Sequence, residues 1–333
     1  MASVSDSLEF ALLNDYQRDF PLAPQPFLKI AQEQGTSHAA VLEHFARLRA
    51  SGAISRIGAV FRPKALGASS LAAMAVPEAD LRQVAERISA FPEVNHNYER
   101  EHRYNLWFVA AARSQQQLAD TLARIEAATG HAVLNLPLVE DYHIDLGFDL
   151  SEGAAKPAAA PGAAQAADFT LVPADVPLVE AIETGLDIVP YPYQALGERA
   201  GTGETQVMAG LARLLAAGAI KRFGVVVRHH ELGYTANAMA VWNVPDERVT
   251  AAGRGLAALD GVTLCYRRKR GPPHWPYNLF CMVHGRDRGA VEARLASLTA
   301  AAGLGGLPHA VLFSRRRFKQ RGAHYFAGEL AHG

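Results

Sequence analysis

The chain has 333 residues, of which 49% are hydrophobic and 20% charged, and Lys plus Arg equal Asp plus Glu at 33 each. This length suits more than one compact domain, and a formal net charge of zero argues against a nucleic-acid binder, which ordinarily carries a basic excess. The two cysteines, Cys265 and Cys281, are too few for a disulfide framework or a Cys-rich metal site, so we expect a reducing cytoplasm and no protein-held metal. We expect no signal peptide, and no apolar run reaches the ~20 residues that a membrane span needs.

An internal repeat divides the chain. Residues 151–167, SEGAAKPAAAPGAAQAA, have no apolar periodicity and predict a flexible Ala/Pro/Gly linker between two halves of similar length. The sequence GAISRIG at 52–58 returns as GAIKRFG at 218–224, and YNL at 104–106 returns at 277–279. Matches in the same order predict a diverged duplication, in which each half contains a pair of domains.

Each half begins with the pattern of a winged helix-turn-helix, which we assign to residues 1–66 and 168–232. In the first half, a short helix near 27–31 precedes a turn, a helix over 38–50 that Thr36 or Ser37 can cap, and a wing over 54–61. The second half repeats this order at 193–200, 204–217 and 220–227. Helix, turn, helix and wing in this order are typical of that domain.

The remainder of each half predicts a ferredoxin-like β-α-β-β-α-β unit, over residues 67–150 and 233–333. In the first unit we expect strands at 71–76, 94–100, 104–111 and 133–144, with helices at 81–91 and 116–129. In the second we expect strands at 236–244, 262–268, 277–284 and 310–318, with helices at 248–259 and 289–302. The fold class is therefore α+β, a tandem duplication that resembles the Lrp/AsnC regulators.

Two motifs narrow the resemblance. They are NHNYEREHRYNLWF at 95–108, and CYRR at 265–268 followed by PPHWPYNLFCMVHG at 272–285. Together they resemble the D-type and L-type subunits of siroheme decarboxylases, fused in that order. The resemblance implies a carboxy-lyase that removes two acetate carboxyl groups from siroheme to give 12,18-didecarboxysiroheme, in d-type haem (heme d1) biosynthesis. It also implies no cofactor, because the iron enters with the substrate and the macrocycle can delocalise the charge that decarboxylation leaves.

The residue types in the motifs agree with a flat tetrapyrrole rimmed by carboxylates. Arginine pairs with carboxylates through its planar fork, and aromatic side chains can cover the ring. The candidate substrate-binding residues are Tyr98, Arg100, Tyr104, Trp107, Tyr266, Arg267, Arg268, Arg270, Trp275, Tyr277 and Asn278. Histidine suits proton delivery near neutral pH, so His96, His102 and His274 are the catalytic candidates.

The two halves are not equivalent, because His96 of the first half corresponds to Leu264 of the second. We therefore expect one half to carry most of the chemistry, although the sequence does not say which. Strand alternation predicts that Val94, His96, Tyr98 and Arg100 share one face, and cross-strand packing is the structural alternative for the aromatic residues. The basic run at 315–321, RRRFKQR, is either a solvated tail, a clamp on substrate or on the other half, or a nucleic-acid patch.

The alternative function is an Lrp/AsnC-type DNA-binding regulator that senses a small molecule or haem. The two candidate recognition helices carry few basic residues, partly offset by Glu43 and Glu204, so we expect no DNA and no membrane as partners. A tetrapyrrole carrier without turnover is a third reading. A homodimer, and association with other haem-biosynthesis proteins of the family, are left open.

Overall fold

The computed structural model describes residues 8–62, 65–144, 169, 171–228 and 233–326. The chain divides into two compact units, 1–66 with 147–232 and 67–146 with 233–333. Each unit therefore combines the domains of one type: the first holds both helix-turn-helix segments, and the second holds both β-α-β-β-α-β segments. The predicted linker at 151–167 lies outside the described residues. Within the described part of the chain, no helix has the length and apolar character to cross a membrane.

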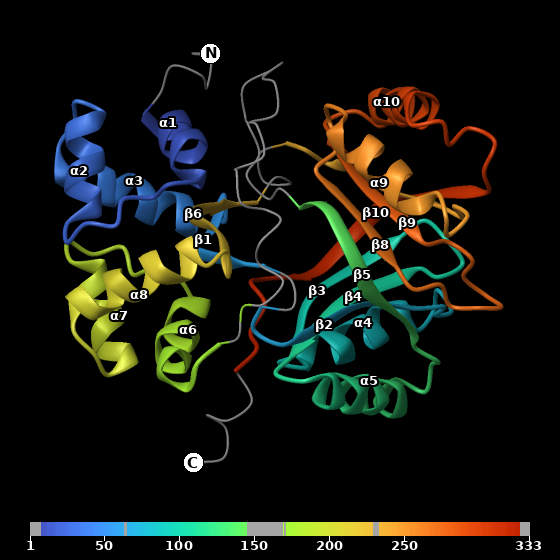
Figure 1. The fold of residues 1–333 in the computed structure, drawn as a ribbon, viewed down its shortest axis with the longest axis horizontal. Coiled ribbons are helices and arrows are strands. Elements are labelled where there is room, and N and C mark those ends of the chain that lie inside the picture. Colours follow the sequence, from blue (N-terminus) through green and yellow to red (C-terminus); the bar gives the residue numbers. More distant parts are fainter. Residues whose placement is uncertain (1–7, 63–64, 145–168, 170, 229–232, 327–333) are drawn as a thin grey trace. The chain divides into compact units, whose positions relative to one another are not determined.

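The first unit consists of two copies of one helical motif joined by their wings (Figure 1). Its elements are α1 (Leu8–Asn14), α2 (Pro26–Glu33), α3 (His38–Ala50), β1 (Ile54–Phe61), α6 (Val176–Glu183), α7 (Pro192–Ala200), α8 (Glu204–Ala216) and β6 (Ile220–Val227). Short 3-10 turns, η2 (Asp15–Gln17) and η4 (Pro173–Asp175), complete it. The predicted helices and wings are confirmed, whereas α1 and α6 had not been predicted.

Local signals in the sequence explain these elements. Ser37 caps α3, because its hydroxyl accepts a hydrogen bond from the Ala40 amide at 3.1 Å. The wings β1 and β6 form a two-stranded antiparallel sheet, in which Gly58 lies opposite Gly224. A Cβ on Gly224 would come within 2.5 Å of the Tyr16 carbonyl oxygen, so glycine is required where the turn η2 crosses this sheet. The last glycine of GAISRIG and of GAIKRFG, Gly58 and Gly224, thus lies where the two wings pair.

The second unit is a closed eight-stranded barrel with helices on its outside (Figure 1). The first half contributes β2 (Ala68–Met74), α4 (Leu81–Ala90), β3 (Val94–Arg100), β4 (Leu106–Ala112), α5 (Gln115–Thr129) and β5 (Leu134–Ile144). The second half contributes β7 (Ala236–Trp242), α9 (Val249–Ala258), β8 (Leu264–Arg268), β9 (Leu279–Gly285), α10 (Arg288–Ala301) and β10 (His309–Gln320). The predicted β-α-β-β-α-β order is confirmed in both halves.

Pairing between the halves closes the barrel. The strand order is β10-β3-β4-β2-β5-β8-β9-β7, so the last strand of each half pairs with the second strand of the other. Since all neighbours are antiparallel, β3 and β8 run in the same direction, and the hairpins that follow them emerge at the same end of the barrel. Closure also leaves no free strand edge.

Three apolar clusters follow the alternation of side chains along the strands. Two of them, around Phe108 and around Trp242, pack the helices onto the outside of the barrel. The third fills the inside, with Leu71, Trp107 and Met239 among its members. Each strand therefore gives alternate residues to an outer and an inner core.

One sequence prediction about strand faces is wrong. Val94 packs with the helix-covered outer core, whereas Tyr98 and Arg100 lie on the inner face. The cause is an irregularity in the β3–β4 ladder between Val94 and His96, because an extra residue in one strand reverses the alternation. No periodicity in the sequence marks this bulge.

The basic run at 315–321 continues the last strand and is not a solvated tail. Arg317 lies opposite Tyr98 in the β10–β3 ladder, and Arg315 and Arg316 both approach the Glu99 carboxylate. Lys319 donates to the carbonyl oxygens of Ser89 and Phe91 at the end of α4, at 2.6 and 2.9 Å. The run therefore joins the two halves, as one of the three sequence readings proposed.

Candidate active site

The inside of the barrel gathers most of the predicted site residues. The inner cluster includes Tyr104, Trp107, Tyr266 and Trp275, with Tyr277 packed against it. Around them lie one more aromatic side chain, Phe280, and aliphatic and sulfur-containing side chains such as Leu312 and Met282. The two sequence motifs, far apart in the chain, thus meet in one aromatic-lined interior.

Two arginines at equivalent positions of the repeat point into this interior. Arg100 is 8% exposed and donates to the Leu312 carbonyl oxygen at 3.1 Å, and Arg268 donates to the Leu136 carbonyl oxygen at 2.9 Å. The Arg268 guanidinium lies 4.6 Å from the centre of the Tyr266 ring, and the Arg100 guanidinium lies 5.8 Å from that of Tyr98. Burial lowers the pKa of both arginines below the ordinary value, because desolvation disfavours the charged form.

The arginines have no carboxylate partner among the salt bridges of the described residues, and the Arg268 Nε atom is buried without a hydrogen-bond acceptor. A buried cation without a counter-ion is costly unless an anion binds beside it. An acidic group bound beside Arg100 or Arg268 would supply the missing counter-ion.

Trp275 occupies the barrel end from which the two hairpins emerge. The indole is 0% exposed, and its ring centre lies 5.0 Å from that of Trp107, 5.4 Å from His102 and 6.0 Å from Tyr104. Trp107 donates its indole hydrogen to the Tyr104 carbonyl oxygen at 2.6 Å, whereas the buried Trp275 indole nitrogen finds no acceptor among the described residues. The second-half hairpin thus places an unpaired donor against the first-half aromatic residues.

His96 lies on β3, four strand positions or ~13 Å before Arg100. Its Nδ1 atom is 2.8 Å from the Asn95 side-chain oxygen, and its ring stacks beside Tyr98 at 6.3 Å. With the Asn95 amide oxygen as acceptor, the His96 Nδ1 atom carries the hydrogen. The Asn95 side chain thus fixes the orientation of the His96 ring.

His102 lies in the hairpin after β3 and has the opposite tautomer. Its Nδ1 atom accepts a hydrogen bond from the Tyr104 amide at 3.0 Å, so in the neutral ring the hydrogen resides on Nε2. Burial, and next the charge of Arg103, lower the pKa of His102 below 6.5. His102 is therefore suited to donate a hydrogen bond as a neutral imidazole.

The remaining candidates are placed differently. His274 is exposed, in the turn between the cis-linked Pro272–Pro273 pair and Trp275. Arg267 and Arg270 both pair with Asp246, and Asn278 holds the Val244 backbone through its side-chain amide. All four lie at the hairpin, and the polar groups of Arg267, Arg270 and Asn278 are engaged within the protein.

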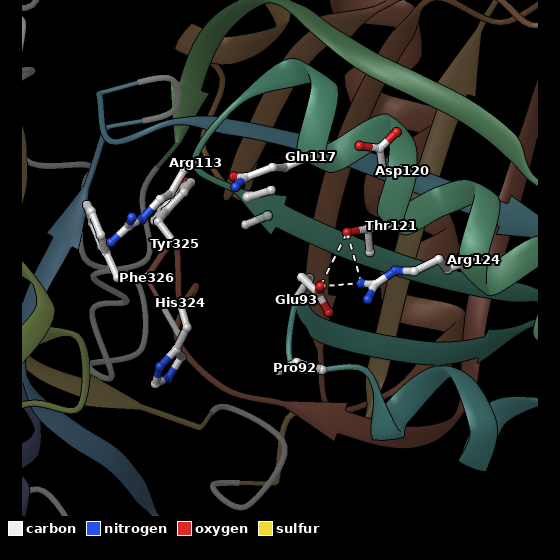
Figure 2. A pocket seen from close by; sticks show the side chains of 12 residues that line it. Pro92, Glu93, Arg113, Gln117, Asp120, Thr121, Arg124, His324, Tyr325 and Phe326 are labelled. Carbon is white, nitrogen blue, oxygen red and sulfur yellow. Dashed lines mark hydrogen bonds and ion pairs between the residues drawn. The ribbon is translucent and has the colours of Figure 1, made fainter. Parts of the chain in front are cut away.

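Two described pockets lie outside this interior. One, shown in Figure 2, lies between α5, the start of β3 and residues 324–326, and in it Glu93 accepts hydrogen bonds from Thr121 and Arg124. The other lies between α10 and the β7–β10 pair, near Trp242. Neither pocket is lined by a predicted site residue. Among the described residues, no group of three or more His, Cys, Asp or Glu could hold a metal ion.

Sequence reasoning missed Asp246, Asn95, Phe280 and Met282. Asp246 follows Val244-Pro245, which repeats Val76-Pro77 of the first half, so the repeat could have drawn attention to it. Asn95 was within the quoted motif but was assigned no role. Met282 lies 3.9 Å from an Arg100 nitrogen, and no sequence signal indicates that contact.

Comparison with known families matches all four segments of the chain. A model of the AsnC-like ligand binding domain matches residues 65–143 and 231–319. A model described as the siroheme decarboxylase NirDL-like HTH domain matches residues 9–54 and 175–220. The described halves and their duplication are therefore those of known domain types.

Similar proteins cover almost the whole chain. The siroheme decarboxylase NirDL subunit of Paracoccus denitrificans is 46% identical over 96% of this chain and 97% of its own length. The siroheme decarboxylase of Hydrogenobacter thermophilus is 31% identical over 96% of this chain and 95% of its own. Crystal structures of the siroheme decarboxylase NirDL, alone and in complex with an iron-uroporphyrin III analogue, match with TM-scores of 0.68 at 28% and 27% identity, covering 96% of this chain and 94% of theirs.

Proposed function

The chain belongs to the siroheme decarboxylase family, and on that basis we propose that it is a carboxy-lyase that decarboxylates siroheme. We propose further that it removes two acetate carboxyl groups, giving 12,18-didecarboxysiroheme for d-type haem synthesis. The proposal needs no resident cofactor, because the iron arrives with the substrate. A cytoplasmic location belongs to the same proposal and agrees with two cysteines that are free thiols.

One observation carries the proposal, namely the pair Arg100 and Arg268 inside an aromatic barrel. Each guanidinium donates to a backbone carbonyl and keeps further N–H groups for an acidic ligand. Their positions correspond in the repeat, so each half offers one buried arginine to a carboxylate of the ligand. A polyanion such as siroheme carries the carboxylates that two such arginines can pair with.

The chemistry requires little from the protein. When the bond between an acetate carbon and its carboxylate breaks, the electron pair stays on the side-chain carbon, where the conjugated macrocycle can delocalise it. A proton delivered to that carbon completes a methyl group, and carbon dioxide leaves. His96 is the proposed proton donor, because Asn95 fixes the orientation of its ring. His102 is proposed to donate a hydrogen bond to a carboxylate, and His274 is proposed to do the same from the exposed turn.

The test is anaerobic incubation of the purified chain with siroheme, followed by mass analysis of the tetrapyrrole. Loss of two carbon dioxide units is expected. His96→Ala is expected to lower kcat by at least ~100-fold, within the range of general acid catalysis, without abolishing binding. His309→Ala, at an exposed site on the same barrel, is the matched control and should retain activity.

Other outcomes would redirect the proposal. Siroheme that binds but is unchanged would indicate a carrier, and siroheme that neither binds nor reacts would refute the assignment. The regulator alternative finds little support in the helices α3 and α8. Arg47 on α3 approaches Glu9, and Arg213 on α8 pairs with Asp175, so these two cations are already partnered, and Arg49 is the remaining arginine of α3. We therefore expect no shift of duplex DNA by the chain at low salt.

A further inference from the structure

The two hairpins at one end of the barrel are held in different ways. In the first half, the Asn105 side chain exchanges two hydrogen bonds with the Val76 backbone, at 3.0 and 2.8 Å. In the second half, Asn278 does the same with Val244, at 2.9 Å for both. This attachment is repeated, but only in the second half do the described ion pairs join the carboxylate that follows it, Asp246, to two arginines of the hairpin. The longer hairpin, residues 269–278, is therefore fixed at more points than the shorter one.

Asp246 is the centre of this additional attachment. Its carboxylate accepts from Arg267 at 2.8 Å and from Arg270 at 2.9 and 3.1 Å. Arg270 in turn donates to the carbonyl oxygens of Val244 at 2.6 Å and Pro276 at 2.9 Å. One guanidinium thus joins the segment after β7 to the far arm of the hairpin, and the carboxylate keeps that guanidinium in place.

The residue between the fixed points is Trp275. Its backbone N–H and carbonyl both pair with Gly271, at 2.8 Å, which closes a tight turn. Its neighbours His274 and Pro276 are exposed, whereas Trp275 is 0% exposed and packs on His102 across the barrel end. A shift of the hairpin arm would therefore move the indole away from the His102 ring.

We propose that Asp246 is a positioning residue of the decarboxylase, which acts by holding Arg270 and the 269–278 hairpin so that Trp275 stays packed on His102. The inference rests on the proposed function for its effect on turnover, but its effect on Trp275 and His102 does not depend on that function. Asp246 contacts Arg267, Arg270 and Asn278 at the hairpin, and no hydrogen bond or ion pair among the described residues joins it to Arg100, Arg268 or His102 in the interior. Its influence passes through Arg270, Pro276 and Trp275.

Displacement of Trp275 would change the pKa of His102, because that pKa depends on burial. The groups around the His102 ring are Arg103 and Tyr104 on its own hairpin, and the uncharged Trp275 indole from the facing one. Burial is the main cause of the lowered pKa of His102, so water admitted by a displaced indole would raise that pKa towards 6.5. Arg270, and next Arg267, lower the pKa of Asp246, so the Asp246 carboxylate stays ionised across the neutral range and does not itself titrate there.

The experiment uses the full chain with Asp246→Ala, Asp246→Glu as the conservative rescue, and Glu78→Ala as the control. Glu78 holds the matching position in the first half and is exposed. For Asp246→Ala, we expect faster hydrogen exchange of the Trp275 indole N–H and an upward shift of the His102 titration measured by NMR. We also expect kcat to fall ~10-fold and KM to change less than ~2-fold, because a small misplacement near the reacting groups slows the reaction more than it weakens binding. Asp246→Glu should restore most of each change, and Glu78→Ala should cause none.

The readouts separate the two proposals. If the unaltered chain decarboxylates siroheme but Asp246→Ala changes neither His102 nor kcat, the positioning role is refuted and the function stands. If Asp246→Ala exposes Trp275 and shifts the His102 titration while the unaltered chain shows no turnover, the proposed function is refuted and the positioning of Trp275 by Asp246 stands. Trp275→Phe provides an independent check, because it keeps the aromatic cover and should leave the His102 titration near its original position.

Discussion

Replacing the interior arginines with methionine should weaken siroheme binding without unfolding the barrel. In Arg100→Met, the chain loses a charge-assisted hydrogen bond to the Leu312 carbonyl, worth ~1.5–3 kcal/mol, but is relieved of a desolvated cation. The lowered pKa of Arg100 shows that its charge destabilises the folded state, because the folded state binds that proton less tightly than the unfolded chain. The charge therefore opposes folding below the folded-state pKa. We expect the free energy of unfolding to change by no more than ~1 kcal/mol, since the two effects oppose each other.

Affinity should respond much more strongly. A hydrogen bond from a charged donor is worth ~1.5–3 kcal/mol, which corresponds to a ~10-fold to ~150-fold rise in Kd. Arg268→Met should behave in the same way, because it occupies the equivalent position with the same kind of carbonyl partner. Chemical unfolding gives the stability and siroheme titration by absorbance gives Kd, with Arg199→Met in the other unit as the control. Destabilisation by more than ~3 kcal/mol with unchanged Kd would show that the arginines are structural and would refute the reasoning.

Three further predictions concern the same barrel. If neutral His102 is the active form, activity should fall as pH drops through its pKa, which lies below 6.5, and His102→Ala should remove that limb of the pH–rate profile. Asn105→Ala and Asn278→Ala should each lower the free energy of unfolding by ~1–3 kcal/mol, because each leaves a backbone donor and acceptor unpaired; equal Tm values with the unaltered chain would contradict this. Gly253→Ala should destabilise the barrel by ~1–3 kcal/mol, measured by urea unfolding, because its Cβ would come within 2.1 Å of the Tyr142 ring, whereas Gly255→Ala, with nothing near, should be tolerated.

Much of the fold could be predicted because the elements depend on local patterns. The helix at 38–50, the wing at 54–61 and the strand at 94–100 have the bounds that capping and periodicity indicate. The association of the equivalent domains from the two halves could not be predicted in this way. It depends on pairings such as β5 with β8 and β10 with β3, which join residues far apart in the chain and leave no periodic signal.

The candidate site shows a similar division. Residue type was enough to select Arg100, Arg268 and Trp275, which the barrel brings inside. It could not separate them from Arg267 and Arg270, which have the same chemistry but meet Asp246 on the outside of the hairpin. The difference between these arginines is set by strand alternation and by the length of the hairpin, and both depend on where β8 ends. The bulge after Val94 misled the strand-face prediction for the same reason, since one added residue changes which side chains face inward.

The asymmetry of the repeat bears on how two carboxyl groups could be removed. The duplication has kept an arginine in both halves, Arg100 and Arg268, but the residue that corresponds to His96 in the second half is Leu264. Binding groups are thus doubled while the proposed proton donor is single, so both decarboxylations would use His96, with the substrate reoriented between them. On this argument His96→Ala should slow both steps together, and mass analysis over time should show no enrichment of a singly decarboxylated tetrapyrrole relative to the unaltered chain. A variant that stops cleanly after one carbon dioxide would instead require a second donor, and His102 or His274 would then have to supply it.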